Sequence, residues 1–168
     1  MKTNIAGLMS LIAEYEKKLN SLENLLNSNI YSVSIQELNG TINVIEDTKS
    51  EFDDNLAEYK DILSKVTKLK SILYTKNNTF TLSDGRTIQT AIIDNTNLRK
   101  LKSLYESMLF SKSVKRRVTE VNNSYFECKS INYNSDDIKK ELDIVNYKIQ
   151  KTDFEISKLN SLEFEIDI

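Results

Sequence analysis

Two heptad repeats before Asn77 constrain the fold more than any other feature of the chain. The first repeat alternates three- and four-residue spacings between apolar residues (Ile5, Leu8, Ile12, Tyr15, Leu19, Leu22, Leu26). The second repeat has the same spacing, with two lysines as its polar members (Ile35, Leu38, Ile42, Ile45, Lys49, Phe52, Leu56, Tyr59, Leu63, Val66, Lys70, Leu73). This spacing keeps the side chains on one side of an α-helix. The two segments are therefore predicted to form long helices that pack through an apolar seam.

Capping residues set the predicted ends of the helices. Thr3 and Thr87 are the predicted caps of the first and third helices. Ser34 and Glu37 have the spacing of a capping box, so the second helix is predicted to begin there. Gly40 then lies inside that helix, at a cost of about 1 kcal/mol relative to alanine. We expect four helices, at about residues 4–27, 35–75, 88–110 and 136–160.

Three segments have the composition or periodicity of β-strands. Residues 79–82 and 124–131 are rich in β-branched and aromatic side chains, and residues 164–168 alternate apolar and acidic residues. The first two segments are predicted to pair as a small ribbon at one end of the helices. The third is predicted to add an edge to this ribbon, in the same subunit or a neighbouring one.

The composition favours long helices in one soluble domain. Among 168 residues there are three glycines and no prolines, so helix breakers are few. Hydrophobic residues make up 39% and charged residues 29% of the chain, as in soluble helical proteins. The predicted fold is mainly all-α: a single-domain, coiled-coil-rich antiparallel bundle of four helices with a small β-ribbon at one end.

The second predicted helix is too long for the first to cover. At a rise of ~1.5 Å per residue the first is roughly 39 Å long and the second roughly 60 Å. Ile62, Leu69 and Ile72 widen the apolar seam in the second half of the longer helix. We expect these three residues to be buried between copies of the chain. The acidic first half and more basic second half of that helix favour an antiparallel dimer, or a multiple of it.

A six-residue motif, Leu82-Ser83-Asp84-Gly85-Arg86-Thr87, opens the third predicted helix. A basic stretch, a β-like run and a final amphipathic helix follow. Together, residues 79–160 resemble a family of small bacterial helical proteins often named septicolysin, and the Leu-x-Asp-Gly-Arg-Thr motif is the most specific part of the likeness. The resemblance implies a mainly helical fold and, through the family's name, a lytic activity.

Turn chemistry accounts for three residues of this motif. Gly85 can adopt a positive φ, Asp84 can accept hydrogen bonds from the nearby backbone, and Thr87 can cap the helix. Arg86 is not required by the turn. It either pairs with a carboxylate, from the fourth helix or the C-terminal tail, or binds an anionic ligand, and we favour the structural pair.

The basic residues Lys112, Lys115, Arg116 and Arg117 form the strongest candidate patch for an anionic partner, such as nucleic acid or a lipid surface. The formal net charge of the whole chain is -2, and its sequence has no recognised nucleic-acid-binding motif. Two interpretations are favoured over an anionic partner. The basic residues lie in a solvated loop, or they contact the acidic stripe of another helix (Asp47, Glu51, Asp54, Glu58, Asp61).

The side chains most often used in catalysis are scarce. The chain has no histidine and one cysteine, Cys128, which excludes an ordinary catalytic triad and a zinc site of several thiolates within one chain. Cys128 lies among apolar residues and is predicted to be a small buried hydrophobe. No calcium-loop spacing is present. We therefore expect no catalytic residue, no cofactor and no bound metal.

The leading hypothesis is a non-enzymatic, self-associating scaffold or protein-interaction protein in the cytoplasm. The cytoplasmic location follows from the single cysteine and from the lack of an apolar segment long enough to span a membrane. One alternative is a membrane-active, pore-forming protein whose amphipathic helices refold onto a bilayer. The other is a nucleic-acid accessory factor that acts through residues 112–117. The heptads are typical of soluble helices and contain no tryptophan, which counts against a membrane-active protein. The acidic net charge counts against a nucleic-acid accessory factor.

Overall fold

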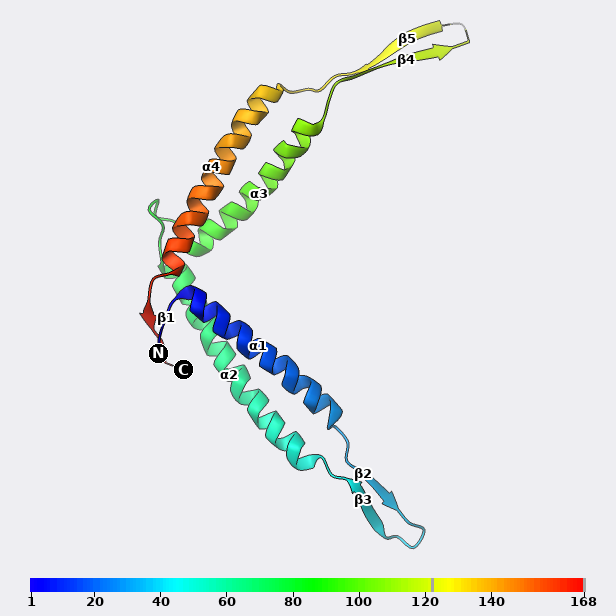
Figure 1. The fold of residues 1–168 in the computed structure, drawn as a ribbon, viewed down its shortest axis with the longest axis vertical. Helices are drawn as coiled ribbons and strands as arrows, with labels where there is room; N and C mark the ends of the chain where they lie inside the picture. Colours follow the sequence, from blue (N-terminus) through cyan, green and yellow to red (C-terminus); the bar gives the residue numbers. More distant parts are fainter. Residues whose placement is uncertain (122, 168) are drawn as a thin grey trace. The chain divides into compact units, whose positions relative to one another are not determined.

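The structure, a computed structural model, describes residues 1–121 and 123–167. In this part of the chain four helices and six short strands follow one another (Figure 1): β1 (Lys2–Thr3), α1 (Ile5–Ser28), β2 (Val33–Gln36), β3 (Ile42–Glu46), α2 (Lys49–Thr79), α3 (Ile88–Phe110), β4 (Val114–Glu120), β5 (Asn123–Lys129), α4 (Ser135–Asn160) and β6 (Phe164–Glu165). The bounds of α1, α3 and α4 agree with the prediction to within about two residues.

The chain divides into two compact units. The first contains residues 1–79 and 160–168, and the second contains residues 80–159. Each unit has the same order of elements: a helix, a β-hairpin and a second helix. The predicted coiled-coil bundle of all four helices is not confirmed, because a heptad seam specifies that a helix has a partner without specifying how many.

The core of the first unit lies between α1 and α2. Near the start of α1, Leu8 and Ile12 pack with Leu69 of α2 and with Ile166 from the C-terminal tail. Further along, a second cluster joins the two helices (Leu19, Leu22, Ile62, Val66). Ion pairs flank the seam, with the Lys18 Nζ 2.5 Å from a Glu58 carboxylate oxygen and the Lys70 Nζ 2.6 Å from one of Glu16. The heptad spacing thus positions both helices as predicted over this region.

The prediction for residues 35–48 is wrong: they form most of a β-hairpin, and α2 begins only at Lys49. β2 and β3 pair antiparallel, with Ile35 opposite Asn43. In the loop between them Gly40 has a φ of 87°, and its N–H donates to the Glu37 carbonyl at 2.9 Å. A left-handed residue in a tight turn interrupts a helix, so the predicted capping box at Ser34 does not form.

The remaining strands also pair differently from the prediction. β5, which contains most of the predicted 124–131 segment, pairs with β4 rather than with residues 79–82. Residues 79–82 contribute one isolated bridge, between Thr81 and Thr87. In the tail, β6 pairs with β1 at the other end of the chain, and the buried side chain of Ile166 joins the core of the first unit. The last residue of the predicted strand 164–168 lies outside the described residues.

Polar contacts join α3 to α4 in the second unit. The buried Asn95 side chain donates from Nδ2 to an Asp153 carboxylate oxygen at 2.8 Å and to the Ile149 carbonyl at 3.4 Å. Arg99 donates to both oxygens of Asp153, at 3.0 and 2.8 Å. Ile88, Ala91, Val145 and Ile149 supply buried apolar surface. A buried polar residue of this kind fixes the register of two helices.

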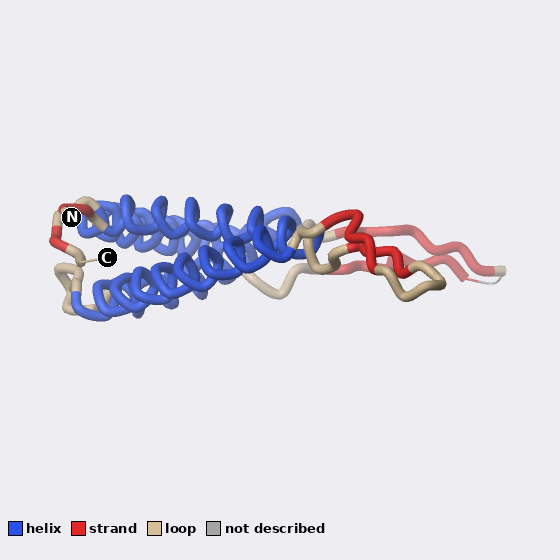
Figure 2. The backbone as a smooth tube through the Cα atoms, turned by 90° about the horizontal axis from the view of Figure 1, so that it is seen from below, coloured by secondary structure: helices blue, strands red, loops and turns tan. Residues whose placement is uncertain are grey.

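The two β-hairpins lie beyond the ends of their helices, as the strands coloured red in Figure 2 show. We call β2–β3 with its loop hairpin 1 and β4–β5 with its loop hairpin 2. Every residue of β2 and β3 is exposed, and in β4 and β5 only Val118 is partly covered. In the described chain, no helix combines the length and apolar character needed to cross a membrane.

Candidate functional site

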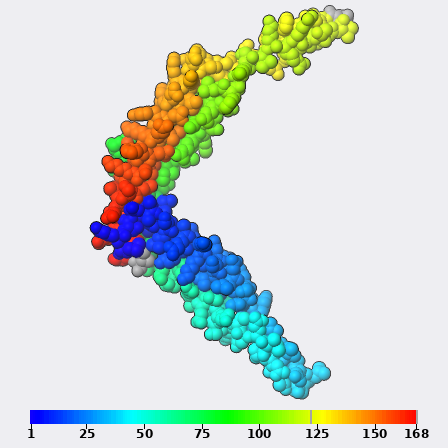
Figure 3. Space-filling model, in the orientation of Figure 1, coloured from blue at the N-terminus to red at the C-terminus, as the bar shows by residue number. Residues whose placement is uncertain are grey.

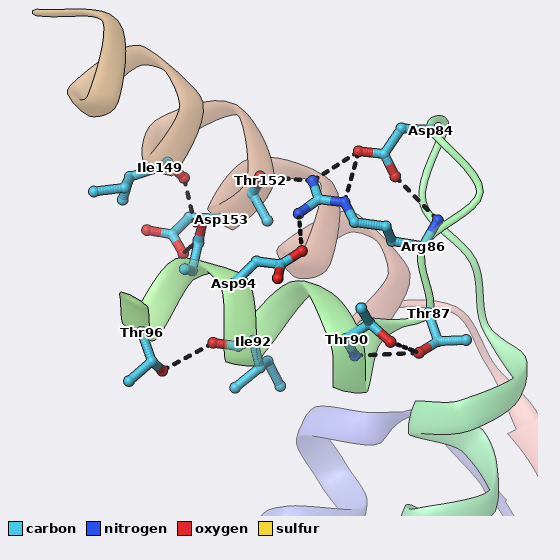
Figure 4. A network of polar contacts seen from close by, with 11 residues as sticks. Asp84, Arg86, Thr87, Thr90, Ile92, Asp94, Thr96, Ile149, Thr152 and Asp153 are labelled. Carbon is cyan, nitrogen blue, oxygen red and sulfur yellow. Dashed lines mark hydrogen bonds and ion pairs between the residues drawn. The ribbon is translucent and has the colours of Figure 1, made fainter. Parts of the chain in front are cut away.

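Arg86 is the centre of a polar network in the second unit (Figure 4). Its Nε and Nη2 donate to the Asp84 Oδ2 at 2.9 and 2.7 Å. Its Nη1 donates to the Asp94 Oδ2 on α3 at 2.8 Å, and its Nη2 reaches the Thr152 hydroxyl on α4 at 3.3 Å. One guanidinium group therefore connects the turn before α3 with both helices of the unit.

The turn that carries Arg86 has a defined backbone. Gly85 has a φ of 85°, and its N–H donates to the Leu82 carbonyl at 3.0 Å. The Asp84 Oδ1 accepts from the Arg86 N–H at 3.1 Å, and the Thr87 hydroxyl accepts from the Thr90 N–H at 3.2 Å to cap α3. The positive φ, the side-chain acceptor and the cap are those predicted from the sequence.

A carboxylate from α4 holds the other side of the turn. Glu155 accepts from the Ser83 N–H and from the Ser83 hydroxyl, each at 2.8 Å. These bonds lower the pKa of Glu155, the backbone donor having the larger effect. The pKa of Asp84 is also lowered, first by the hydrogen bonds from the Arg86 side chain. The pKa of Arg86 is raised by its hydrogen bonds to Asp84 and then to Asp94. The network therefore stabilises the charged forms of all three groups.

The carboxylates that Arg86 contacts differ from those expected. They come from its own turn and from α3, not from α4 or the tail. A depression of about 360 Å³ lies beside the network, with Lys148 and Lys151 in its wall. An anionic ligand there would compete with Asp84 and Asp94 for the guanidinium, because both already neutralise its charge.

The structure places the three predicted interface residues inside the first unit. The exposed fractions of Ile62 and Leu69 are 3% and 0%, and α1 covers both. Ile72 is partly buried against the cluster that contains Leu69 and Ile166. Contrary to the prediction, these residues need no second copy to cover them, because the second helix begins 14 residues later than predicted and the C-terminal tail covers its end.

The predicted basic patch lies on and just before β4. Successive residues of a strand face opposite sides, so Arg116 lies on one face and Lys115 and Arg117 on the other. Arg117 is opposite Phe126 of β5, and the Lys115 Nζ is 4.4 Å from the centre of the Phe126 ring. Cys128, predicted to be buried, is exposed on the same hairpin because β4 and β5 have no layer packed against them.

Much of the predicted acidic stripe has partners within the first unit. Glu58 pairs with Lys18, and the Asp61 carboxylate lies 2.8 Å from the Lys65 Nζ. The hydrogen bond that Lys65 donates to Asp61 raises the pKa of Lys65. These two carboxylates are therefore less available to meet the basic patch of another copy than the sequence suggested.

Hairpin 1 is a candidate surface that the sequence argument missed. Its apolar side chains are exposed to an unusual degree: 55% for Ile35, 62% for Ile42 and 64% for Val44. The signal was present in Asn39-Gly40, a common turn pair, flanked by alternating apolar residues on both sides. The heptad spacing of the same residues concealed it.

Both hairpins present apolar side chains and open strand edges. In hairpin 2 the exposed apolar residues include Val114, Tyr125 and Phe126, and the space-filling view shows β4 and β5 as a narrow projection from their helices (Figure 3). Each strand pairs on one side only, so its other edge keeps backbone donors and acceptors without a protein partner in the described chain. Such edges readily accept another strand.

Comparison with known proteins places this fold in a family. Residues 12–158 match the model of DUF6847, a family of unknown function. The chain belongs to DUF6847. A crystal structure of a functionally unknown conserved protein from Corynebacterium diphtheriae is similar to this DUF6847 member with a TM-score of 0.62 and 16% sequence identity, over 98% of this chain and 100% of that one. At this identity the likeness shows the fold alone. No curated protein matches the sequence.

The DUF6847 match corrects the earlier resemblance. The chain does not belong to the family named septicolysin, and the lytic activity implied by that name no longer has support. The Leu82 to Thr87 motif that carried the resemblance is explained by the turn geometry around Arg86. Short turn motifs recur in unrelated proteins because the same backbone conformation selects the same residues.

Proposed function

We propose that this DUF6847 protein is a non-enzymatic, self-associating interaction protein in which pairs of helices support exposed β-hairpins. The observation that supports the proposal is the exposure of both hairpins: among their described strand residues, only Val118 is partly covered. Two-stranded hairpins are marginally stable in water, and exposed apolar side chains beside open edges are typical of surfaces that bind another protein. The contact surface is thus different from the one predicted at Ile62, Leu69 and Ile72.

The non-enzymatic part of the proposal is supported by the character of the polar network. Arg86, Asp84 and Asp94 bind one another, and Glu155 binds the turn, so the charged groups hold secondary structure together. Among the described residues, no group of three or more acidic or cysteine side chains could hold a metal ion. A structural role accounts for each contact of the network.

Self-association is tested by the mass of the protein in solution. Sedimentation velocity and light scattering over about 1–100 µM should show a mass that rises above the 19.4 kDa of one chain as concentration increases. A single species of 19.4 kDa over the whole range would contradict the proposal.

A nucleic-acid accessory role is the second candidate, favoured by one feature of hairpin 2. Arg117 lies directly opposite Phe126, and Tyr125 is exposed on the other face, so cations and aromatic rings alternate on one ribbon. Binding to a labelled single-stranded oligonucleotide should be strongest at low salt and weaken steeply as salt is added. No binding at about 20 mM salt would contradict this candidate, because phosphate contacts are strongest there.

A further inference from the structure

We propose that hairpin 1 of one copy binds hairpin 2 of a second copy. The inference deepens the proposed function and rests on it, since it names the surface and the partner through which the chain self-associates. It is carried by three properties of the hairpins: their opposite charge, their open edges and their exposed apolar side chains.

The charges of the two hairpins are complementary. From Ile30 to Asp47 the chain has three acidic residues, Glu37, Glu46 and Asp47, and no basic one. From Lys112 to Ile131 it has five basic and two acidic residues. Contact between two copies of hairpin 1, or between two copies of hairpin 2, would bring like charges together. Contact between hairpin 1 and hairpin 2 brings unlike charges together, which selects this pairing and its orientation.

Four of the charges involved form no ion pair within their own units. Among the described residues, no carboxylate lies within ion-pair distance of Arg116 or Arg117, and no basic group lies within that distance of Glu37 or Glu46. Arg116 is opposite Glu127 in the ladder without forming an ion pair with it. The basic charge of β4 therefore faces solvent and is available to a partner.

Open edges provide the backbone part of the contact. β3 has five residues and β4 has seven, and each is paired with one neighbour only. A strand added to either edge would satisfy donors and acceptors that only water satisfies now, the usual mode of strand addition. Joining hairpin 1 to hairpin 2 would convert two isolated ribbons into one four-stranded sheet, a size that is stable when one face is apolar.

The apolar side chains supply a face for that sheet. On hairpin 1 Ile42 and Val44 lie on one face, because they alternate along β3. On hairpin 2 Val114, Val118 and Tyr125 share a face, since Val118 is opposite Tyr125 in the ladder. Placing these two faces on the same side of a joined sheet would bring the apolar side chains of both hairpins together, with Arg116 between Val114 and Val118 on that face.

A second copy fits these features better than a lipid surface does. Hairpin 1 has three carboxylates and no cation, so an anionic membrane would repel it. Lipid also cannot satisfy the backbone groups of open strand edges. Every copy has one hairpin of each charge, so each copy can offer both halves of the contact to other copies.

Charge reversal tests the pairing directly. One variant reverses hairpin 1 with Glu37→Lys and Glu46→Lys, and another reverses hairpin 2 with Arg116→Glu and Arg117→Glu. A control variant makes the same acidic-to-basic change on α1, with Glu14→Lys and Glu23→Lys, at exposed residues away from both hairpins. The altered side chains lie outside both cores, so circular dichroism at 222 nm should report the same helix content for all variants.

We expect each hairpin reversal to raise the dissociation constant for self-association at least about tenfold at low ionic strength, because like charges then meet at the contact. The α1 control should self-associate like the unaltered chain. Mixing the two reversed variants should restore association, since one then has two basic hairpins and the other two acidic ones. Combining both reversals in one chain should also restore it.

The outcomes separate the inference from the proposed function. If the unaltered chain is monomeric up to about 100 µM, both fail. If it self-associates but neither reversal weakens association more than the α1 control, the hairpin pairing is wrong and self-association stands. The pairing is also wrong if the reversals weaken association but neither mixing nor combining them restores it. Loss of oligonucleotide binding in the hairpin 2 variant, with self-association unchanged, would assign that hairpin to nucleic acid instead.

Discussion

Arg86→Lys is the substitution that best tests the role of the polar network. Lysine keeps the positive charge but has one compact ammonium group instead of a planar fork. It can reach Asp84 or Asp94, but it cannot donate to both and to Thr152 in the present geometry. The turn before α3 would therefore lose part of its connection to α3 and α4 while the net charge stays the same.

The contacts of Arg86 set the size of the expected effect. Three of its hydrogen bonds are charge-assisted, with lengths of 2.7, 2.8 and 2.9 Å. A hydrogen bond to a charged group contributes about 1.5–3 kcal/mol when buried, and an exposed ion pair contributes under about 1 kcal/mol. The Arg86 side chain is 31% exposed, which lies between these cases. Since lysine retains one contact, we expect the second unit to lose about 1–2 kcal/mol.

Arg99→Lys is the matched control for this substitution. Arg99 also contacts a carboxylate, Asp153, but its side chain is 59% exposed and it donates to one residue only. The control should lose under about 1 kcal/mol.

Urea unfolding followed by circular dichroism at 222 nm gives the free energy of unfolding of each variant. Hydrogen exchange at the Leu82 and Gly85 amides, which are bonded within the turn, reports the turn itself. Equal losses in the two variants, with unchanged protection of these amides, would refute the reasoning that the fork of Arg86 holds the turn.

Three further predictions follow from the first unit and from the turn. Leu69→Ala should cost about 2–5 kcal/mol of unfolding free energy without abolishing self-association, as measured by urea unfolding and sedimentation, because Leu69 is fully buried under α1 and the tail. Gly40→Ala should destabilise hairpin 1 by about 1–2 kcal/mol, seen as faster exchange of the Glu37 and Gly40 amides with unchanged helix content, since φ at this position is 87° and no atom would clash with the added Cβ. The pKa values of Asp84 and Glu155 are lower in the folded chain than in the unfolded one, so their stabilisation is complete above about pH 4–5 and is lost as the pH falls through the folded values. Thermal unfolding from pH 7 to pH 3 should show this loss, and Asp84→Asn with Glu155→Gln should reduce it; an unchanged pH dependence would contradict the assignment.

Local sequence signals were sufficient where the structure is local. The existence of α1, α3 and α4 follows from their apolar spacing, and their bounds follow from capping and turn residues at their ends. The conformation of Gly85 and the cap at Thr87 follow from turn chemistry. At the start of α1 the cap is Asn4 rather than the predicted Thr3, a shift of one residue between two side chains that can both accept from the backbone. Such features depend on residues within one or two turns of each other.

The start of the second helix was missed because one pattern satisfies two periods. Ile35, Leu38, Ile42 and Ile45 fit a heptad, and Val33, Ile35, Ile42 and Val44 also fit two alternating strands separated by a turn. The turn pair Asn39-Gly40 decides between them, since a glycine with positive φ favours the hairpin and disfavours the helix.

Contacts between distant segments could not be derived from the sequence. Ile166 covers Leu69 from nearly 100 residues further along the chain, and the tail reaches it by pairing with β1. Asp94 was not predicted as the partner of Arg86 because any of several carboxylates had suitable chemistry. The sequence limits which residue types can meet, and the tertiary fold selects among them.

Polar contacts, rather than apolar side chains, attach hairpin 1 to its helices. Thr48, which is 7% exposed, donates its hydroxyl toward the Asn29 and Tyr31 carbonyls, each at 3.2 Å, and its N–H donates to the Ser32 hydroxyl. The two ends of the hairpin are thus joined by polar contacts where they meet α1 and α2.

In the second unit, hydrogen bonds join the corresponding segments at the base of hairpin 2. The Tyr133 hydroxyl donates to the Met108 carbonyl, and the Ile131 N–H donates to the Ser113 hydroxyl. Both hairpins are held at their bases by hydrogen bonds, so their apolar residues are not needed to attach them to the helices. Since exposed apolar side chains reduce solubility and these contribute little to either unit, their presence on both hairpins supports the proposal that a partner covers them.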